Sequence, residues 1–338
     1  MISHAPKVAA IVLSWNRRDE VLETIDLLTR DDYPNLDVIV VDNASTDGTV
    51  AALISAYPAV RVRALPHNLG IIGRDLGVMD TDAEIVAFFD DDSAPDAGAI
   101  SRMVALFGAN PAIGIVPFSV YGGAHATEYM AGLAPSQLIG YVASGVGLRR
   151  EAIIAAGFSD ADFFWGAEEW DLAIRILNRG YTIAFDPAIR AQHRTSVLHR
   201  SYRRWRRLTT RNETWMAIKY FPLTRVPLMI WRVLFNNIAR SRLDGVPPWY
   251  ALRGATAALW HWRIAWQKRE PIGPAIRARY ERNYPPFQAI TPLLRASTGR
   301  RLPTSTPFMV YRILFWKADL ARRDDGVAPL TAWRGTPQ

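Results

Sequence analysis

Short apolar segments alternate with segments of helical periodicity along the first half of this chain. Residues 8–13, 36–41 and 85–89 are almost wholly apolar and rich in β-branched side chains, which is typical of strands buried on both faces. Residues 18–28 place apolar side chains at helical spacing, and an Asp-Gly turn signal precedes a second helix over residues 49–57. This alternation predicts an α/β fold with a mostly parallel sheet covered by helices on both faces.

Polar side chains follow each apolar segment. Asn16 comes shortly after the first and Asp42 directly after the second, while Asp90, Asp91 and Asp92 follow the third. Ligands of open α/β sheets bind beyond the carboxyl ends of the strands. Adjacent carboxylates repel one another unless a cation or hydrogen-bond donors lie among them, and a hard divalent ion that bridges phosphates needs only one or two of them. The sequence therefore favours a metal site here over the alternative, a solvated loop that caps a helix.

A second acidic cluster stands at the predicted start of a helix over residues 168–179. Glu168 and Glu169 lie between Trp165 and Trp170. The helix dipole alone favours acidic residues in a first turn, and Asp171 could form an ordinary surface pair with a basic residue one turn later. A carboxylate beside indole rings, in contrast, would be partly desolvated, which raises its pKa toward values useful to a general base. The residues alone leave both interpretations open.

His193 follows a predicted strand, in a chain that contains no cysteine. Without cysteine, thiolate metal sites and disulfides are excluded. A single histidine is more often structural or solvated than a ligand, although neutral imidazole does bind metals. The residue is therefore a secondary candidate for the metal site.

Together these segments resemble an inverting family 2 glycosyltransferase of the GT-A fold. Five segments match in the order typical of that family: VAAIVLSWN at 8–16, VVDNASTDGT at 40–49, NLG at 68–70, FFDDD at 88–92 and GAEEWDL at 166–172. Each segment alone is a weak signal, but five in order at plausible spacings are a strong one. The resemblance covers roughly residues 7–195.

The resemblance implies a division of the chain and a set of site residues. Residues 1–195 would form a Rossmann-like nucleotide-binding domain with a mostly parallel sheet, and residues 196–338 a mainly helical C-terminal region. The implied donor-binding residues are Ser14, Trp15, Asn16, Asp42, Asn68, Gly70, Arg74, Asp90 and Asp91. The implied metal ligands for Mn²⁺ or Mg²⁺ are Asp92 and His193, the implied catalytic base is Glu169, and the acceptor-side candidates are Trp165, Glu168 and Trp170.

Two positions depart from the family pattern. The family commonly has Glu-Asp where this chain has Glu168-Glu169, so the assignment of the base to Glu169 rather than Glu168 is less secure. Asp75 stands where an asparagine is common, which leaves the role of that helix open.

The function implied by the resemblance is nonprocessive, inverting transfer of a hexose or deoxyhexose from a UDP- or dTDP-linked sugar to a hydroxyl acceptor, in cell-envelope glycan or other glycoconjugate synthesis. The chain lacks the Gln-x-x-Arg-Trp motif and the spanning segments usual in polysaccharide synthases of the family. Two alternatives stay open: a sugar nucleotidyltransferase, which needs the same nucleotide fold but no Glu169, and an inactive membrane-associated scaffold.

The chain changes character near residue 190. Residues 190–280 hold 19 basic and three acidic side chains and seven of the 12 tryptophans. Basic and indole side chains suit an anionic membrane surface, which a lipid-linked acceptor would make useful. The alternative is a helical cap whose arginines serve the fold; nucleic-acid binding ranks lowest. With no apolar leader at residues 1–7, we expect a cytoplasmic protein, peripheral on the inner face of the cell membrane.

Overall fold

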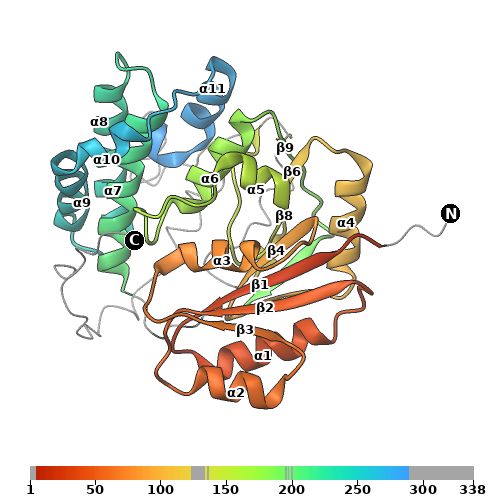
Figure 1. Cartoon of the computed structure of the whole chain (residues 1–338). Helices are drawn as coiled ribbons and strands as arrows, with labels where there is room; N and C mark the ends of the chain where they lie inside the picture. Colours follow the sequence, from red (N-terminus) through yellow and green to blue (C-terminus); the bar gives the residue numbers. More distant parts are fainter. Residues whose placement is uncertain are drawn as a thin grey trace.

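The computed structural model describes residues 5–122, 134, 137–194, 196, 198 and 201–288. The chain up to residue 193 forms these elements: β1 (Val8–Ser14), α1 (Arg18–Thr29), β2 (Leu36–Asp42), α2 (Thr49–Ala56), β3 (Arg61–Ala64), η1 (Gly70–Ile72), α3 (Gly73–Met79), β4 (Ile85–Asp90), β5 (Ser93–Pro95), α4 (Ala99–Ala109), β6 (Ile113–Pro117), β7 (Ser119–Tyr121), β8 (Val146–Arg149), α5 (Arg150–Ala156), α6 (Glu168–Asn178), β9 (Thr182–Ile183) and β10 (Arg190–His193). The basic part adds α7 (Tyr202–Tyr220), α8 (Val226–Leu243), α9 (Trp249–Trp260), α10 (Trp262–Gln267), α11 (Pro274–Asn283) and η4 (Pro285–Phe287). Figure 1 shows these elements in sequence colours.

The main sheet has seven strands in the order β3-β2-β1-β4-β8-β6-β9. Strands β3, β2, β1 and β4 run parallel, and β8 is antiparallel to both of its neighbours. In this register Ser14 lies beside Asp42, and Leu13 lies beside Asp90. The predicted mostly parallel α/β sheet is confirmed, and its parallel half brings the polar strand ends to one edge.

A second, three-stranded sheet of order β5-β10-β7 lies next to that edge. Strand β5 follows the Asp90–Asp92 triplet, and β10 pairs with it antiparallel so that His193 stands opposite Ser93. This pairing joins residues about 100 positions apart in the sequence and places His193 beside the triplet.

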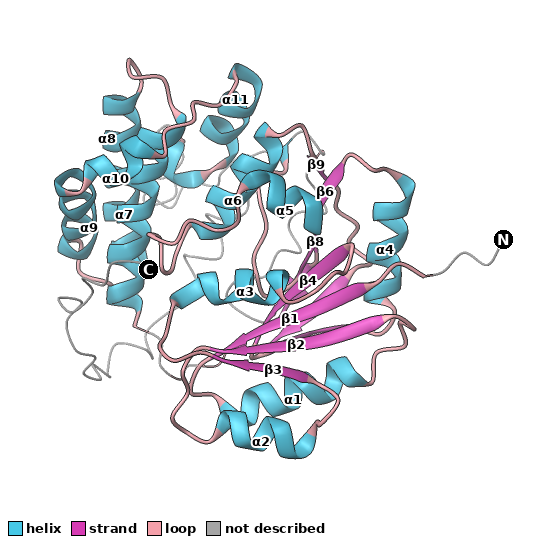
Figure 2. Ribbon diagram, viewed as in Figure 1, coloured by secondary structure: helices cyan, strands magenta, loops and turns pink. Residues whose placement is uncertain are grey.

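Alternate side chains of β1 point into two hydrophobic clusters. Ala10 and Val12 belong to the cluster with side chains of α1 and α4 on one face of the sheet. Ala9 and Ile11 belong to the other cluster, which continues through α3, α5 and α6. Figure 2 shows α1 and α3 on opposite sides of the strands. Full burial of a side chain the size of Val12 or Ile11 contributes about 1.5–3 kcal/mol, and that of an alanine methyl group less.

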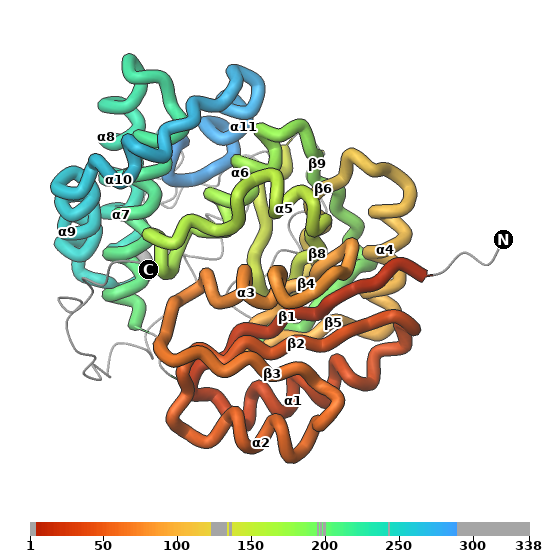
Figure 3. Tube along the Cα trace, in the orientation of Figure 1, coloured from red at the N-terminus to blue at the C-terminus, as the bar shows by residue number. Residues whose placement is uncertain are grey.

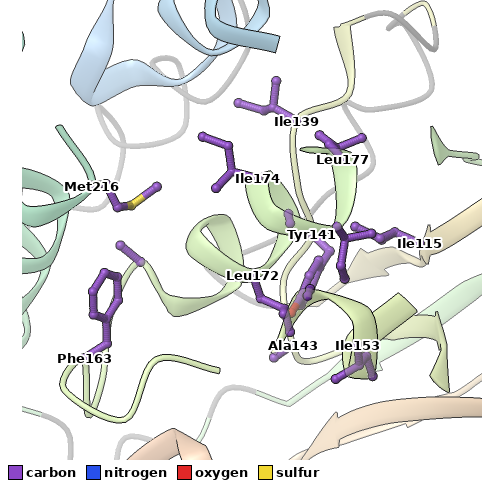
Figure 4. Close-up of a cluster of buried hydrophobic side chains, with 14 of the residues drawn as sticks. Ile115, Ile139, Tyr141, Ala143, Ile153, Phe163, Leu172, Ile174, Leu177 and Met216 are labelled. Carbon is purple, nitrogen blue, oxygen red and sulfur yellow. The ribbon is translucent and has the colours of Figure 1, made fainter. Parts of the chain in front are cut away.

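The helices of the basic region share a core with the sheet domain. Figure 4 shows Met216 of α7 close to Ile174 of α6, with Phe163 and Leu172 in the same cluster. The trace in Figure 3 places α7–α10 together on the side where α6 begins. Buried side chains of the sheet domain and of α7–α11 thus belong to one continuous hydrophobic cluster.

Within the C-terminal region, α9 packs closely on α7 through small side chains. Ala251, Gly254, Ala255 and Ala258 are buried on that face, and a Cβ added at Gly254 would lie 2.3 Å from a carbonyl oxygen of α7. None of the helices in residues 5–288 that the structure describes is long and apolar enough to cross a membrane.

Three segments are locally irregular. The apolar segment at residues 113–120 forms two strands, β6 and β7, because Pro117 has no N–H to donate and ends the first ladder. In the segment at residues 140–148, strand β8 begins only at Val146. The segment after Asn68 starts as a 3₁₀ turn at Gly70 before α3.

Candidate active site

The carboxyl ends of β1 and β2 hold buried polar atoms that have no hydrogen-bond partner among the residues described above. Asp42 is 1% exposed; one of its carboxylate oxygens accepts a hydrogen bond from the Ser45 backbone N–H at 2.9 Å. The other oxygen of Asp42 and the hydroxyl of Ser14 make no hydrogen bond within residues 5–288 as described. Buried polar atoms of a folded protein nearly always have partners, so both atoms are available to a ligand. These are the positions predicted to bind the donor.

The loops after these strands are tied together. Asn16 has a left-handed backbone, with φ of 51°, and its side-chain oxygen accepts from the Thr46 N–H at 2.7 Å. Trp15, next to it, is half-buried. The Asn43 side chain donates to the Gly70 carbonyl at 2.8 Å and accepts from the Leu69 N–H at 2.9 Å. Asn43 therefore holds the turn at residues 68–70 against β2, a role that sequence reasoning missed although the residue lies in a matched segment.

The turn at Asn68 to Gly70 is itself closely packed. The Asn68 side-chain oxygen accepts from the Gly70 N–H at 2.8 Å. Gly70 has φ of +68°, and a Cβ at this position would lie 2.3 Å from the Phe164 carbonyl oxygen. Glycine is required here for both reasons.

Asp90, Asp92 and His193 form a group that could hold a metal ion. One ligand atom from each lies within 4.8 Å of the others. His193 Nε2 lies 3.1 Å from an Asp92 carboxylate oxygen and 3.9 Å from one of Asp90. Two carboxylates and an imidazole are a donor set that suits Mn²⁺, and Mg²⁺ with added waters. The structure thus brings together the two predicted metal ligands, Asp92 and His193, with Asp90.

Asp91 is turned away from this group. Its carboxylate accepts from Arg17 at 2.7 Å, and the same guanidinium nitrogen lies 3.6 Å from Asp92. Burial raises the pKa of Asp91 to about 7, although the Arg17 charge opposes the shift. Arg17 was not among the predicted site residues; its position directly after Asn16 was the available signal. The structure gives Asp91 a contact with Arg17, and its predicted contact with the donor stays a prediction.

Arg74 connects the metal group to a small pocket. The side chain is buried, its guanidinium donates to Asp90, and its Nε has no partner in the described part of the chain. Arg74 lines the pocket together with Phe88, Tyr141, Glu168 and Glu169. A fixed cation between the metal group and a pair of carboxylates suits a diphosphate, which it can bind through more than one N–H.

Glu168 and Glu169 differ in exposure. Glu168 is 5% exposed, and burial raises its pKa well above the ordinary value. Glu169 is only half-buried; burial raises its pKa to about 7, with Arg74 lowering it and Asp90 raising it. A carboxyl group of a half-buried residue with a pKa near neutrality meets the requirements of a general base. Of the two, Glu169 fits the predicted role better.

Asp171, Trp165 and Trp170 of the same cluster also make contacts within the fold. Asp171 is fully buried and accepts from Lys219 Nζ and from the Tyr220 hydroxyl, each at 2.6 Å. The alternative of an i,i+4 pair is correct as to the contact, because Asp171 accepts from Arg175 at 2.8 Å. It is wrong as to the location, because α7 covers this face of α6 and the pair is buried. Trp170 packs against Tyr284 with ring centroids 5.1 Å apart, and the half-buried Trp165 is held through its backbone carbonyl by α7.

Asp75, whose role was open, fixes the chain at Ser159. Its carboxylate accepts from the Ser159 N–H at 2.9 Å and from the hydroxyl at 3.1 Å. Burial raises the pKa of Asp75 to about 6, against the effect of those hydrogen bonds. Ser159 lines the same pocket as Glu169. By binding Ser159, Asp75 therefore helps to fix the wall of that pocket.

Comparison with known proteins shows which family this part of the chain resembles. Residues 9–153 match the family model described as Glycosyl transferase family 2. The chain is 31% identical over 106 residues to "Succinoglycan biosynthesis protein ExoO" of Rhizobium meliloti, with 30% of each chain covered. It is 25% identical over 109 residues to an "Uncharacterized glycosyltransferase" of Haemophilus influenzae, with 32% of this chain and 37% of that one covered. The matches thus span about a third of these relatives.

Solved structures resemble the whole described fold. The mannosyltransferase PcManGT from Pyrobaculum calidifontis, in complex with GDP-Man and Mn²⁺, superposes with a TM-score of 0.53 at 21% identity and covers 92% of this chain and 86% of its own. GalNAc-T7 with UDP, GalNAc and Mn²⁺ gives a TM-score of 0.54 at 12% identity, with 69% of this chain and 52% of that one covered. At such identities the likeness establishes the shared fold.

Proposed function

We propose that the chain is a nonprocessive, inverting glycosyltransferase of family 2, because residues 9–153 match that family's model and the fold is shared with a solved mannosyltransferase. It moves a hexosyl or deoxyhexosyl group from a nucleoside-diphosphate sugar to an acceptor hydroxyl. The observation that carries this proposal is the placement of Arg74, which donates to Asp90 of the metal group and lines one pocket with Glu169.

The donor would lie across the carboxyl ends of β1, β2 and β4. The unpartnered oxygen of Asp42 and the hydroxyl of Ser14 are available to the base or ribose, and a UDP- or dTDP-linked sugar is compatible with an aspartate there. Asp90, Asp92 and His193 would hold Mn²⁺ or Mg²⁺, which as a Lewis acid neutralises the charge that grows on a diphosphate leaving group. Arg74 adds a fixed positive charge on the same side.

Glu169 would act on the acceptor. Its carboxylate takes the proton of the acceptor hydroxyl as the acceptor oxygen forms its bond to the anomeric carbon. The bond between that carbon and the diphosphate oxygen breaks in the same step, and the nucleoside diphosphate leaves with the bonding pair. Attack from the face opposite the leaving group inverts the anomeric centre. Glu168, Trp165 and Trp170 remain candidates for contacts on the acceptor side.

The reaction product distinguishes glycosyl transfer from the two alternatives, a sugar nucleotidyltransferase and an inactive scaffold. With Mn²⁺ and a matching nucleotide sugar, the enzyme should release free nucleoside diphosphate. A sugar nucleotidyltransferase would instead release pyrophosphate from a nucleoside triphosphate and a sugar phosphate, and a scaffold would release neither. A thermal-shift screen selects the donor first, because a ligand at about 100 times its Kd adds about 2.7 kcal/mol of stability.

The outer surface of α9 and α10 supports placement at an anionic membrane, with a lipid-linked acceptor. Whereas the inner face of α9 carries small residues, its outer face carries Leu252, Leu259 and Trp260, of which Trp260 is 85% exposed. Trp262 and Trp266 of α10 are 43% and 44% exposed. A helix that directs its large apolar side chains outward and its small ones inward is unusual for a fully solvated surface.

Basic residues accompany this outer face. Arg253 of α9 and Arg263 of α10 are exposed, a pattern that suits anionic headgroups with tryptophan at the same level. The arginines of α7 are different, because Arg206 is buried between Asn237 and Asp244 and Arg211 donates to backbone carbonyls. The two interpretations of the basic region therefore apply to different helices. The contacts of Arg206 and Arg211 in α7 support a helical cap whose arginines serve the fold, and the exposed side chains of α9 and α10 support binding to an anionic membrane.

A further inference from the structure

The loop that leads to the two glutamates has an unusual backbone. Phe164, Gly166 and Ala167 all have left-handed φ values, of 59°, 88° and 68°. Ala167 directly precedes the first residue of α6, so its conformation sets the direction in which that helix starts. Residues other than glycine rarely adopt the left-handed region of backbone angles. They remain in it only where contacts with the surrounding structure hold the backbone there.

Helix α7 supplies those surroundings on one side. The side-chain amide of Asn212, which is fully buried, donates to the carbonyls of Phe163 at 3.0 Å, Trp165 at 3.1 Å and Gly166 at 2.6 Å. Arg211 donates to the Phe163 carbonyl at 2.9 Å. The two N–H groups of this amide are shared among the three carbonyls, so Asn212 ties three positions of the loop to α7.

The close approach of α7 also requires glycine in the loop. A Cβ at Gly166 would lie 2.3 Å from the Thr209 hydroxyl oxygen. The loop therefore cannot move toward α7, and Asn212 prevents it from moving away. Two independent features of α7 therefore act on the loop, and both meet it at Gly166.

The donor side of the pocket meets the opposite surface of this loop. The Phe164 carbonyl accepts from the Ile71 N–H at 2.8 Å, and Gly70 approaches it so closely that no side chain fits. The loop is thereby held between the 68–71 turn on the donor side and α7 on the other, with Glu169 three residues after Gly166.

We propose that Asn212 is a positioning residue for Glu169, and that α7 is in this way a working part of the catalytic domain. The inference rests on the proposed function, in which Glu169 is the base. Asn212 touches no reacting atom. It holds the loop before α6, and the strained backbone of that loop sets the direction of the first turn of α6. That turn carries Glu169, which lines the same pocket as Arg74. Released from Asn212, the loop can relax toward ordinary backbone angles and turn Glu169 away from the acceptor.

Asn236 provides a matched control. It is also fully buried in the C-terminal region, and its side-chain amide likewise donates to three carbonyls, those of Pro285, Pro286 and Gln288. Asn212→Ala and Asn236→Ala therefore remove the same kind of contact from two different loops. Only the first loop leads to Glu169.

The test compares both variants in the full chain by hydrogen exchange and by kinetics. Asn212→Ala should speed amide exchange across residues 163–172, and Asn236→Ala should not. With the donor selected by thermal shift, kcat of Asn212→Ala should fall on the order of 10²-fold, as expected for a misplaced catalytic group. Its KM for the donor and its affinity for UDP with Mn²⁺ should stay within about twofold, as a purely positional role requires.

Two results would overturn the inference. One is unchanged exchange of residues 163–172 in Asn212→Ala. The other is an equal loss of kcat in both variants, which would mean that general destabilisation explains the effect. Failure of the proposed function looks different, because in that case Glu169→Gln would retain full activity whatever Asn212→Ala does.

Discussion

Lys219→Met tests how strongly the C-terminal helices are coupled to the sheet domain. Lys219 of α7 is 2% exposed, and its Nζ lies 2.6 Å from Asp171 of α6 and 2.8 Å from Asp160. Methionine keeps most of the apolar stem and removes the charge. Asp171 would keep Arg175 and the Tyr220 hydroxyl as partners, and Asp160 would keep Lys268.

The expected loss follows from removal of one partner from a buried ion pair. Such changes cost about 3–5 kcal/mol, and the partners that remain place Lys219→Met near about 3 kcal/mol. The total stability of a domain is only about 5–15 kcal/mol, so the variant should fold but unfold at clearly lower denaturant concentration.

The same ion pair predicts a pH dependence. Burial by itself would raise the pKa of Asp160, but Lys219 and Lys268 overcome this effect and hold the pKa at about 2, below the ordinary 3.8. A lowered carboxyl pKa stabilises the fold above the ordinary value, and the contribution is lost as pH falls toward about 2. In Lys219→Met that pKa should rise, so the stability gap between wild type and variant should narrow as pH falls from 7 to 3.

Urea unfolding at several pH values measures both effects. Lys268→Met is the control, because Lys268 is 42% exposed and contacts the same Asp160; an exposed partner should cost about 1 kcal/mol or less. A loss below about 1 kcal/mol for Lys219→Met, or a gap that does not change with pH, would refute this account of the network.

Two further predictions concern the metal and the membrane. Asp92→Asn should abolish transfer and most Mn²⁺-dependent UDP binding while the fold survives, His193→Ala should do less, and full activity in EDTA would remove the metal from the mechanism. Vesicles of anionic lipid should retain the protein more strongly than neutral ones, less so at high salt, and Trp260→Ser should weaken the salt-resistant part; equal recovery on both vesicle types would exclude an electrostatic attraction.

The strand and helix pattern of the sheet domain could be predicted because each buried strand is a short apolar run ended by polar residues. The edge that gathers Asn16, Asp42 and the Asp90–Asp92 triplet followed from the parallel arrangement. Strand ends were less predictable: Pro117 divides a continuous apolar segment, and the direction of β8 has no local signal.

Residues that act across long sequence separations could not be predicted. Asn212 meets the loop at Phe163, 49 positions earlier, and Lys219 meets Asp160, 59 positions earlier. Nothing near these residues in the sequence distinguishes a buried polar contact from a solvated one. The same limit explains why a surface position was a reasonable prediction for Asp171. Its burial depends on α7, which lies far along the sequence.

The central claim is that Glu169 is the base of a glycosyl transfer, and one comparison tests it most directly. Rates of nucleoside diphosphate release by wild type, Glu169→Gln and Glu168→Gln are measured with the same donor, acceptor and Mn²⁺. Glutamine keeps the shape and removes the basicity, so kcat of Glu169→Gln should fall about 10²–10⁴-fold with donor affinity nearly unchanged. A crippled Glu168→Gln beside an active Glu169→Gln would contradict the assignment, and wild-type rates in both variants would contradict a carboxylate base altogether.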